Sequence, residues 1–265
     1  MAEKNNYPTR RTFLATGIAI TAANTVSQSL TADVTAGENH KTNRLPDVTA
    51  ACIDGVDPGW VALGEKDFVR VNGNEDTWTW KDGVAYCTGN PVSVFRSVKK
   101  YTNFEFVLQW KHMRHGGNSG VFAWADIELL NQLEKSGKKG LPRTGIEIQV
   151  LDPGYQENWI KNHQGKKSNW FTCHGDLFAV GKSKMKPFPP LSANKHRSFP
   201  SEERTRPNNH WNHYYVRGIN GEIRLWVNGK EVSGGNQCKP ASGHFCLESE
   251  GSPVQFKNFR IRELP

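Results

Sequence analysis

Short segments in which apolar and polar residues alternate recur between residues 68 and 262, separated by turn-forming residues. Alternation with a period of two is typical of a β-strand with one buried face. We therefore expect strands over the ranges 68–71, 77–80, 84–88, 92–98, 104–113, 119–124, 145–151, 212–218, 222–227, 244–248 and 254–262. Asn228-Gly229, which lies between 222–227 and 230–232, predicts a tight hairpin.

Helical patterns are scarce, and only 126–135 predicts a helix. Many strands, regular turn spacing and no alternation of strands with helices indicate an all-β sandwich of two antiparallel sheets. The segment 153–209 differs from the rest because it is long, polar and rich in Lys, Pro and His. A long excursion between two core strands often carries function, and we expect it to pack beside the sheet rather than form a second domain.

The N-terminus has the features of a targeting segment. Arg10-Arg11 precedes an apolar run over 13–23, which a polar region follows as far as Ala36. This order is typical of a twin-arginine export signal, and the run is shorter than the roughly 20 residues that a bilayer requires. We expect a signal peptide over 1–36, a linker over 37–55 and one β-domain over 56–265, with the mature protein periplasmic or secreted. Retention by an uncleaved signal is the alternative.

The charge pattern argues against nucleic acid as a partner. Lys and Arg number 34 against 26 Asp and Glu, a net charge of +8, but the basic residues are dispersed and no recognition helix is evident. Dispersed charge indicates solubility, although an exported basic protein could also favour acidic glycans. We expect no integral membrane span in the mature chain.

The five cysteines do not indicate a zinc site, because no two of them have a C-x-x-C spacing. In an oxidising compartment one or two disulfides are expected. Cys238 with Cys246 is the favoured pair, and Cys52 with Cys87 is a weaker one. Cys173 is the single thiol that we consider as a nucleophile, and we rank that role low.

Polar side chains share one face of the predicted strand 145–151. Glu147 and Gln149 point away from the apolar residues of the strand, and Asp152 follows just past its end. These groups can converge on a ligand, although a solvated sheet face gives the same pattern. Their spacing, E-x-Q-x-x-D, is similar to the E-x-D-x-x-E strand of β-jelly-roll endoglucanases. An amide at 149 cannot be the nucleophile of a retaining glycosidase, so standard double displacement is not expected.

The chain also resembles the 3-keto-disaccharide hydrolase family over about 59–264. The order and spacing of the following segments carry the resemblance: Gly59-Trp-Val-Ala-Leu63, Trp80-Lys-Asp-Gly-Val84, Tyr101–Leu108, Asn118-Ser-Gly-Val-Phe122, Gly145–Asp152, Trp211-Asn212, Val227-Asn-Gly229 and Val254–Arg262. The resemblance implies a concanavalin A-like jelly-roll sandwich with one long inserted loop region.

The same resemblance implies cleavage of glycosides already oxidised to a ketone at C3. A C3 ketone acidifies the proton on C2, so a base can remove it and the C1 substituent can leave by β-elimination, after which water adds to the enone. Such a site requires a base, a group that stabilises the enolate oxygen and an acid. A divalent metal ion could serve as the stabilising cofactor. The expected ligand is an oligosaccharide or glycoside, and a sugar 3-dehydrogenase would be the functional partner.

Several carboxylate, amide, hydroxyl, imidazole and indole side chains are candidates for the site. Glu147 is the first choice for the base or a metal ligand, and His174 is a candidate acid, base or metal ligand. The candidate substrate-binding residues are Asn118, Ser119, Trp124, Gln149, Asp152 and Trp170. Glu248 and Glu250 could add carboxylates, but a solvated strand edge is the favoured interpretation.

Two departures from the family pattern concern substrate contacts. Ala123-Trp124-Ala125 stands where the family commonly has an arginine, and His174–Phe178 replaces the usual G-x-x-Y turn. The alternatives to an enzyme are a non-catalytic, lectin-like carbohydrate-binding module, since fold does not fix function, and an envelope adhesion or scaffold protein.

Overall fold

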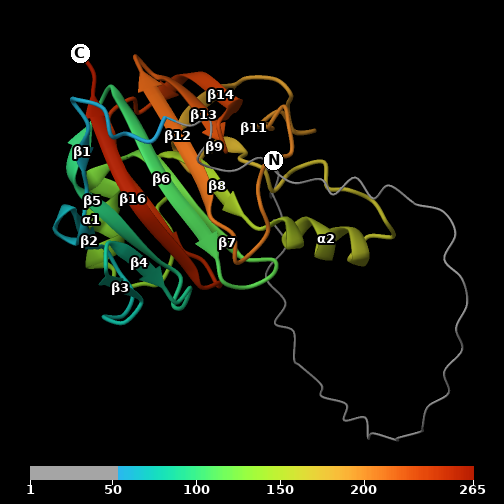
Figure 1. Ribbon diagram of the computed structural model, residues 1–265, viewed down its shortest axis with the longest axis horizontal. Coiled ribbons are helices and arrows are strands. Elements are labelled where there is room, and N and C mark those ends of the chain that lie inside the picture. Colours follow the sequence, from blue (N-terminus) through green and yellow to red (C-terminus); the bar gives the residue numbers. More distant parts are fainter. Residues whose placement is uncertain (1–52) are drawn as a thin grey trace, which may run out of the picture. The chain divides into compact units, whose positions relative to one another are not determined.

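The computed structural model describes residues 53–265, which form two antiparallel β-sheets packed face to face (Figure 1). Within this range the first sheet has the strand order β10-β14-β13-β12-β6-β16-β4-β3, and β1 pairs with β16. Its strands are β1 (Val61–Ala62), β3 (Trp78–Lys81), β4 (Val84–Cys87), β6 (Phe104–His112), β10 (Lys184–Pro187), β12 (Asn212–Ile219), β13 (Glu222–Val227), β14 (Lys230–Lys239) and β16 (Val254–Glu263).

The second sheet has the order β11-β9-β8-β7-β15-β5-β2 in the same part of the chain. Its strands are β2 (Phe68–Arg70), β5 (Ser93–Tyr101), β7 (Asn118–Ala125), β8 (Ile146–Leu151), β9 (Leu177–Ala179), β11 (Arg197–Ser198) and β15 (Gly243–Ser249). The sandwich and each strand predicted from alternation are thereby confirmed. The hairpin is confirmed as well, because Val227 pairs with Lys230 around Asn228, whose φ is +48°.

The core lies between the two sheets and is filled by alternate residues of their strands. Phe104, Phe106 and Leu108 of β6 face Ile148 of β8 and its neighbours across the sandwich. Phe106 stacks on Phe245 of β15 with the ring centroids 4.3 Å apart. Burial of this apolar surface is the main stabilising contribution to the fold.

A short helix, α1 (Ile127–Lys135), covers part of the outer face of the second sheet. Its N-cap is Asp126, whose carboxylate accepts hydrogen bonds from Glu128 N at 2.9 Å and Leu129 N at 3.2 Å. Leu130 of α1 is buried with Phe122 of β7 in a small apolar cluster on that face. The helix predicted over 126–135 is confirmed. One 3₁₀ turn, η1 (Glu65–Asp67), precedes β2.

The excursion between β8 and β12 contains a helix that the sequence did not predict, α2 (Pro153–Asn162), followed by β9, β10 and β11. Asp152 is the N-cap of α2 and Pro153 occupies its first turn, where a missing N–H costs nothing. β9 pairs with β8 and β11 pairs with β9, so the excursion extends the second sheet. β10 pairs with β14 of the first sheet, so the excursion contributes strands to both sheets rather than only packing beside one.

The favoured disulfide prediction is wrong. Cys238 and Cys246 are free thiols, because Cys238 lies in β14 of the first sheet and Cys246 in β15 of the second, buried in different apolar clusters. Cys87 is also free, and Cys52 lies outside the described residues. Burial raises the pKa of the Cys173 thiol far above its ordinary value, which argues against a nucleophilic role.

The predicted export signal and most of the linker also lie outside the described residues. Among the helices of residues 53–265, none is long and apolar enough to cross a membrane.

Candidate functional site

A cavity of about 260 Å³ opens on the outer face of the second sheet. Side chains of β7 and β8 alternate between the two faces, so Ile148 enters the core while Glu147 and Gln149 face outward. The excursion and the segment after α1 supply the walls. The lining residues are Asn118, Leu141, Glu147, Gln149, Leu151, Tyr155, Trp170, Phe171, Phe178, Arg197 and Glu250.

Glu147 is a buried carboxylate on the wall of this cavity. Only 8% of the residue is exposed, and burial is the main reason why its pKa rises to about 8. The negative charges of Glu250 and Asp176 raise the pKa further, while the guanidinium of Arg197 opposes them. Near neutral pH, Glu147 is therefore a carboxyl group that can both hold and release a proton.

A second buried carboxyl group, Glu248 of β15, lies next to Glu147. The two side chains approach each other over Gly120 of β7: a Cβ at Gly120 would stand 2.4 Å from Glu248 Oε2 and 3.3 Å from Glu147 Cγ. Glu248 is fully buried and neither of its side-chain oxygens has a hydrogen-bond partner within the described chain. Burial and the neighbouring carboxylates raise its pKa well above the ordinary value. The expectation of a solvated edge at Glu248 is wrong.

A chain of hydrogen bonds runs along the floor of the cavity and joins four of its side chains. Arg197 Nη1 donates to Gln149 Oε1 at 3.2 Å, and Gln149 Nε2 donates to Asn118 Oδ1 at 3.0 Å. Asn118 Nδ2 in turn donates to Glu250 Oε2 at 2.7 Å. Gln149 Nε2 also donates to the Ser119 carbonyl at 3.1 Å, so both ends of this amide are engaged within the protein. Gln149 thus holds its neighbours in place, which differs from the predicted role of orienting the sugar.

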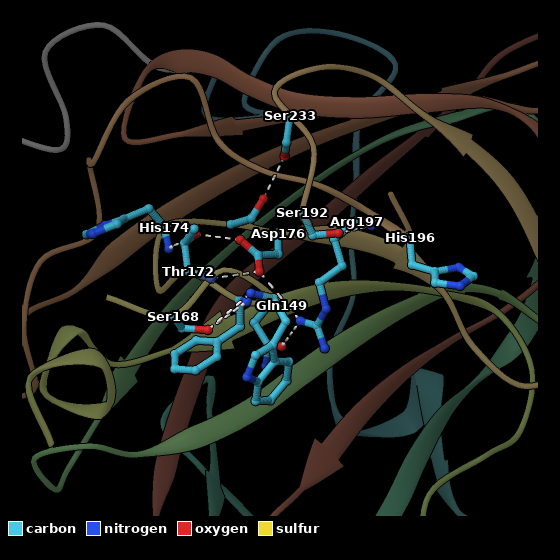
Figure 2. Close-up of polar contacts among 12 residues, drawn as sticks. Gln149, Ser168, Thr172, His174, Asp176, Ser192, His196, Arg197 and Ser233 are labelled. Carbon is cyan, nitrogen blue, oxygen red and sulfur yellow. Dashed lines mark hydrogen bonds and ion pairs between the residues drawn. The ribbon is translucent and has the colours of Figure 1, made fainter. Parts of the chain in front are cut away.

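Asp176 holds the Arg197 end of this series of hydrogen bonds. It is fully buried and accepts hydrogen bonds from Thr172 N at 2.9 Å and Thr172 Oγ1 at 2.5 Å. Arg197 Nη1 lies 3.5 Å from its Oδ2, and Figure 2 shows the guanidinium directed toward both Asp176 and Gln149. Burial raises the pKa of Asp176 to about 6, less than burial alone would, because Thr172 and Arg197 stabilise its charged form.

Aromatic rings form one wall of the cavity. Trp170 is 40% exposed and contacts Phe171 edge to face, with the ring centroids 4.7 Å apart. Phe171 packs in turn against Tyr155 of α2. An exposed indole at the mouth of a polar cavity is suited to stacking on the apolar face of a sugar ring.

Residues 53–262 match the model of a protein family that is described as the 3-keto-α-glucoside-1,2-lyase-like domain. The chain belongs to this family. The lyase-like domain is thus a carbohydrate-acting domain, in agreement with the resemblance found in the sequence. A search against curated proteins returns no match.

Two solved structures share the concanavalin A-like jelly-roll fold of the lyase-like domain. Both are candidate glycosyl hydrolases from Parabacteroides distasonis ATCC 8503. One is 20% identical, with a TM-score of 0.54, and the match covers 78% of this chain and 95% of the other. The second is 21% identical, also with a TM-score of 0.54, and the match covers 77% and 99% of the two chains.

Four of the predicted site residues of the lyase-like domain line the cavity: Asn118, Glu147, Gln149 and Trp170. His174 does not. It is buried, its Nδ1 accepts a hydrogen bond from Thr205 N at 3.2 Å, and its Nε2 lies 3.8 Å from Glu203. Its ring points away from Gln149 in Figure 2. Burial lowers the pKa of His174 to about 4, so the predicted role as acid or base is not supported.

Three further candidates for substrate contact do not line the cavity: Ser119, Trp124 and Asp152. Ser119 is fully buried and donates to the Glu248 carbonyl at 2.8 Å. Trp124 lies in the core, 1% exposed, and donates from Nε1 to the Thr102 carbonyl. The Asp152 carboxylate accepts from the backbone N–H groups of Gly116 at 2.7 Å and Gly154 at 2.9 Å, which makes it a helix cap.

A metal site built on the predicted ligands does not fit the structure. Glu147 lines the cavity and His174 does not, and residues 53–265 contain no group of three or more His, Cys, Asp or Glu side chains that could hold an ion. We therefore derive no step through a metal.

The sequence analysis missed Arg197, Tyr155 and Phe178, all of which come from the excursion. Nothing in the excursion distinguishes Arg197 from its many other basic residues, because its role depends on the pairing of β11 with β9. Glu250, considered as an alternative, does line the cavity.

Proposed function

We propose that this protein cleaves the glycosidic bond of 3-keto-glycosides by removing the C2 proton and eliminating the C1 substituent, after which the enone is hydrated. The observation that carries the proposal is Glu147, a carboxyl group with a pKa of about 8 on the wall of a cavity of about 260 Å³. A base is most effective when its pKa lies near the working pH. A carboxylate with an ordinary pKa would be a far weaker base for a carbon acid. The family description, which names an α-glucoside lyase, supports the same chemistry.

The leaving oxygen at C1 requires a proton. Tyr155 lines the cavity, and burial together with the charge of Glu250 raises its pKa, so it keeps its proton at neutral pH. Trp170 supports the sugar or its substituent by stacking, and the Asn118 amide, fixed between Gln149 and Glu250, presents its polar edge to the sugar hydroxyls. We also propose that the protein is exported through the twin-arginine pathway to the periplasm or the exterior. A sugar 3-dehydrogenase would supply the 3-keto substrate.

The test is release of p-nitrophenol from p-nitrophenyl 3-keto-α-glucoside and from its unoxidised parent. The wild-type protein should act on the keto sugar alone, and Glu147→Gln should lower kcat by at least about 100-fold. Glu157→Gln is the matched control, because Glu157 is an exposed glutamate of α2 outside the cavity and should keep full activity.

Other outcomes would overturn the proposal. Equal release from the unoxidised parent would exclude a mechanism that depends on the ketone. No release from either glycoside, together with measurable binding of the parent sugar, would make the protein a lectin-like binding module.

A further inference from the structure

We propose that Arg197 is the residue that stabilises the enolate oxygen, so that the excursion supplies the cation of the site and the sheet supplies its base. This inference rests on the proposed function. Arg197 is the one Lys or Arg side chain among the described residues that lines the cavity.

The strand register places Arg197 in a row with Glu147. Glu147 of β8 is paired with Phe178 of β9, and Phe178 is paired with Arg197 of β11. Paired residues on neighbouring antiparallel strands project from the same face of the sheet. Arg197 therefore starts two strand spacings, about 10 Å, from Glu147, with Phe178 between them.

The Phe178 ring forms the surface on which the guanidinium rests. Arg197 Cζ lies 3.7 Å from the centroid of Phe178, and 5.4 Å from that of Trp170. The long side chain thus lies over the intervening ring and carries its charge back toward Glu147, which is consistent with its effect on the pKa of that carboxyl group.

The guanidinium is fixed at one nitrogen and available at the others. Nη1 contacts Gln149 and Asp176, while Nε and Nη2 donate no hydrogen bond to any group within the described chain. The Arg197 side chain is only 16% exposed. The guanidinium is thus held in place through Nη1, while the N–H groups of Nε and Nη2 remain able to donate to a ligand. N–H donors that are fixed in this way near a base are suited to stabilising a developing oxyanion.

The electron flow is balanced with these two residues. The C2–H bond breaks, its proton passes to Glu147, and the electron pair moves through C2–C3 onto the C3 oxygen, where the Arg197 N–H groups donate to it. When the charge returns, C3=O re-forms, C1=C2 forms and the C1–O bond breaks. The departing oxygen takes a proton from an acid such as Tyr155. Water then adds across the double bond.

The kinetic test compares Arg197→Gln with Arg197→Lys and with the control Arg204→Gln. Arg204 also lies in the excursion, but its guanidinium donates to the backbone carbonyls of Val227 and Asn228 and it is outside the cavity. Arg197→Gln should lower kcat by about 100- to 1,000-fold with KM changed less than about threefold, and Arg197→Lys should recover part of the loss. Guanidinium ion added to Arg197→Ala should restore turnover in part, and Arg204→Gln should keep kcat.

Exchange of the C2 hydrogen of 3-keto-1,5-anhydroglucitol in D₂O, followed by NMR, isolates the enolisation step, because this sugar lacks the exocyclic leaving group. Arg197→Gln should slow the exchange by a similar factor. A variant with wild-type kcat and exchange, or a loss confined to KM, would overturn the assignment of Arg197 and leave the proposed function intact. Failure of the wild-type protein to act on the keto glycoside would overturn the proposed function itself.

Discussion

Glu147 and Glu248 come from strands that are not neighbours, and they meet across the bare backbone of Gly120 on the strand between them. One carboxyl group lines the cavity and the other is sealed beneath it. Two carboxyl groups this close resist simultaneous ionisation, which favours the protonated form in the pair.

Gly120→Ala should disrupt this pair. The backbone at 120 is not in the left-handed region, but the new methyl group would meet Glu248 Oε2 at 2.4 Å in a site without free space. We expect a loss of about 1–3 kcal/mol in the free energy of unfolding and a marked fall in kcat. Urea denaturation and turnover measure both. Gly64→Ala, at a position with nothing within 4 Å, is the control and should change neither.

The pH dependence of turnover should follow Glu147. The base acts when deprotonated, so kcat/KM should rise about tenfold per pH unit at low pH and level off above a pKa of about 8. A profile of kcat/KM between pH 5 and 10 measures this. An acid limb with a midpoint near 4.5 would show that the base is not a buried carboxyl group.

Stability should show the opposite trend. The pKa of Glu147 is higher in the folded protein, about 8, than the ordinary value of 4.5, so the folded state binds the proton more tightly. Stability is therefore retained below pH 4.5 and lost progressively as pH rises from 4.5 to 8. Glu147→Gln removes this loss, and its Tm should exceed that of the wild-type protein at pH 8 but not at pH 5. Identical Tm curves would contradict the raised pKa.

Trp170 and Trp124 should respond differently to truncation. Trp170→Ala removes an exposed ring at the mouth of the cavity, so we expect KM to rise about tenfold with little change in Tm. Trp124→Ala empties a core site and should cost about 3–5 kcal/mol of stability. Steady-state kinetics and thermal unfolding of the two variants separate the roles. An unchanged KM in Trp170→Ala would exclude stacking on the substrate.

Asp152 is expected to act on stability rather than on binding. Asp152→Ala leaves the N–H groups of Gly154 and Gly116 without their acceptor and should cost about 1–2 kcal/mol, whereas Asp152→Asn keeps an acceptor oxygen and should cost less. Urea denaturation of both variants checks this. Lost turnover at unchanged stability would restore the substrate contact that the sequence suggested.

Alternation identified the strands well because it records directly which side chains enter the core, as with Ile148 against Glu147. It could not reveal what covers the other face. Glu248 was expected at a solvated edge, yet it is fully buried. Helix α2 escaped notice because its apolar residues, among them Tyr155 and Trp159, pack on a local aromatic cluster and give no regular stripe.

The sequence predicted the site residues that share one strand, and it missed those that reach the site through the pairing of different strands. Glu147 and Gln149 are two residues apart in the sequence, so their common face followed from the period of a strand. Arg197 is far from both in the sequence, and it reaches them through the pairing of two short strands. His174 was selected for its chemistry alone, and it lies buried outside the cavity.

The two halves of the site differ in how firmly they are held. β8 lies between β7 and β9 inside the second sheet, whereas Arg197 belongs to a two-residue strand at its outer edge. Such edges open with small free energies while the body of a sheet stays closed. Opening of this edge would withdraw the guanidinium without unfolding the sandwich, and the pKa of Glu147 would then rise further, because Arg197 lowers it. In the proposed mechanism, turnover would therefore depend on the docking of one edge strand as well as on the stability of the sandwich.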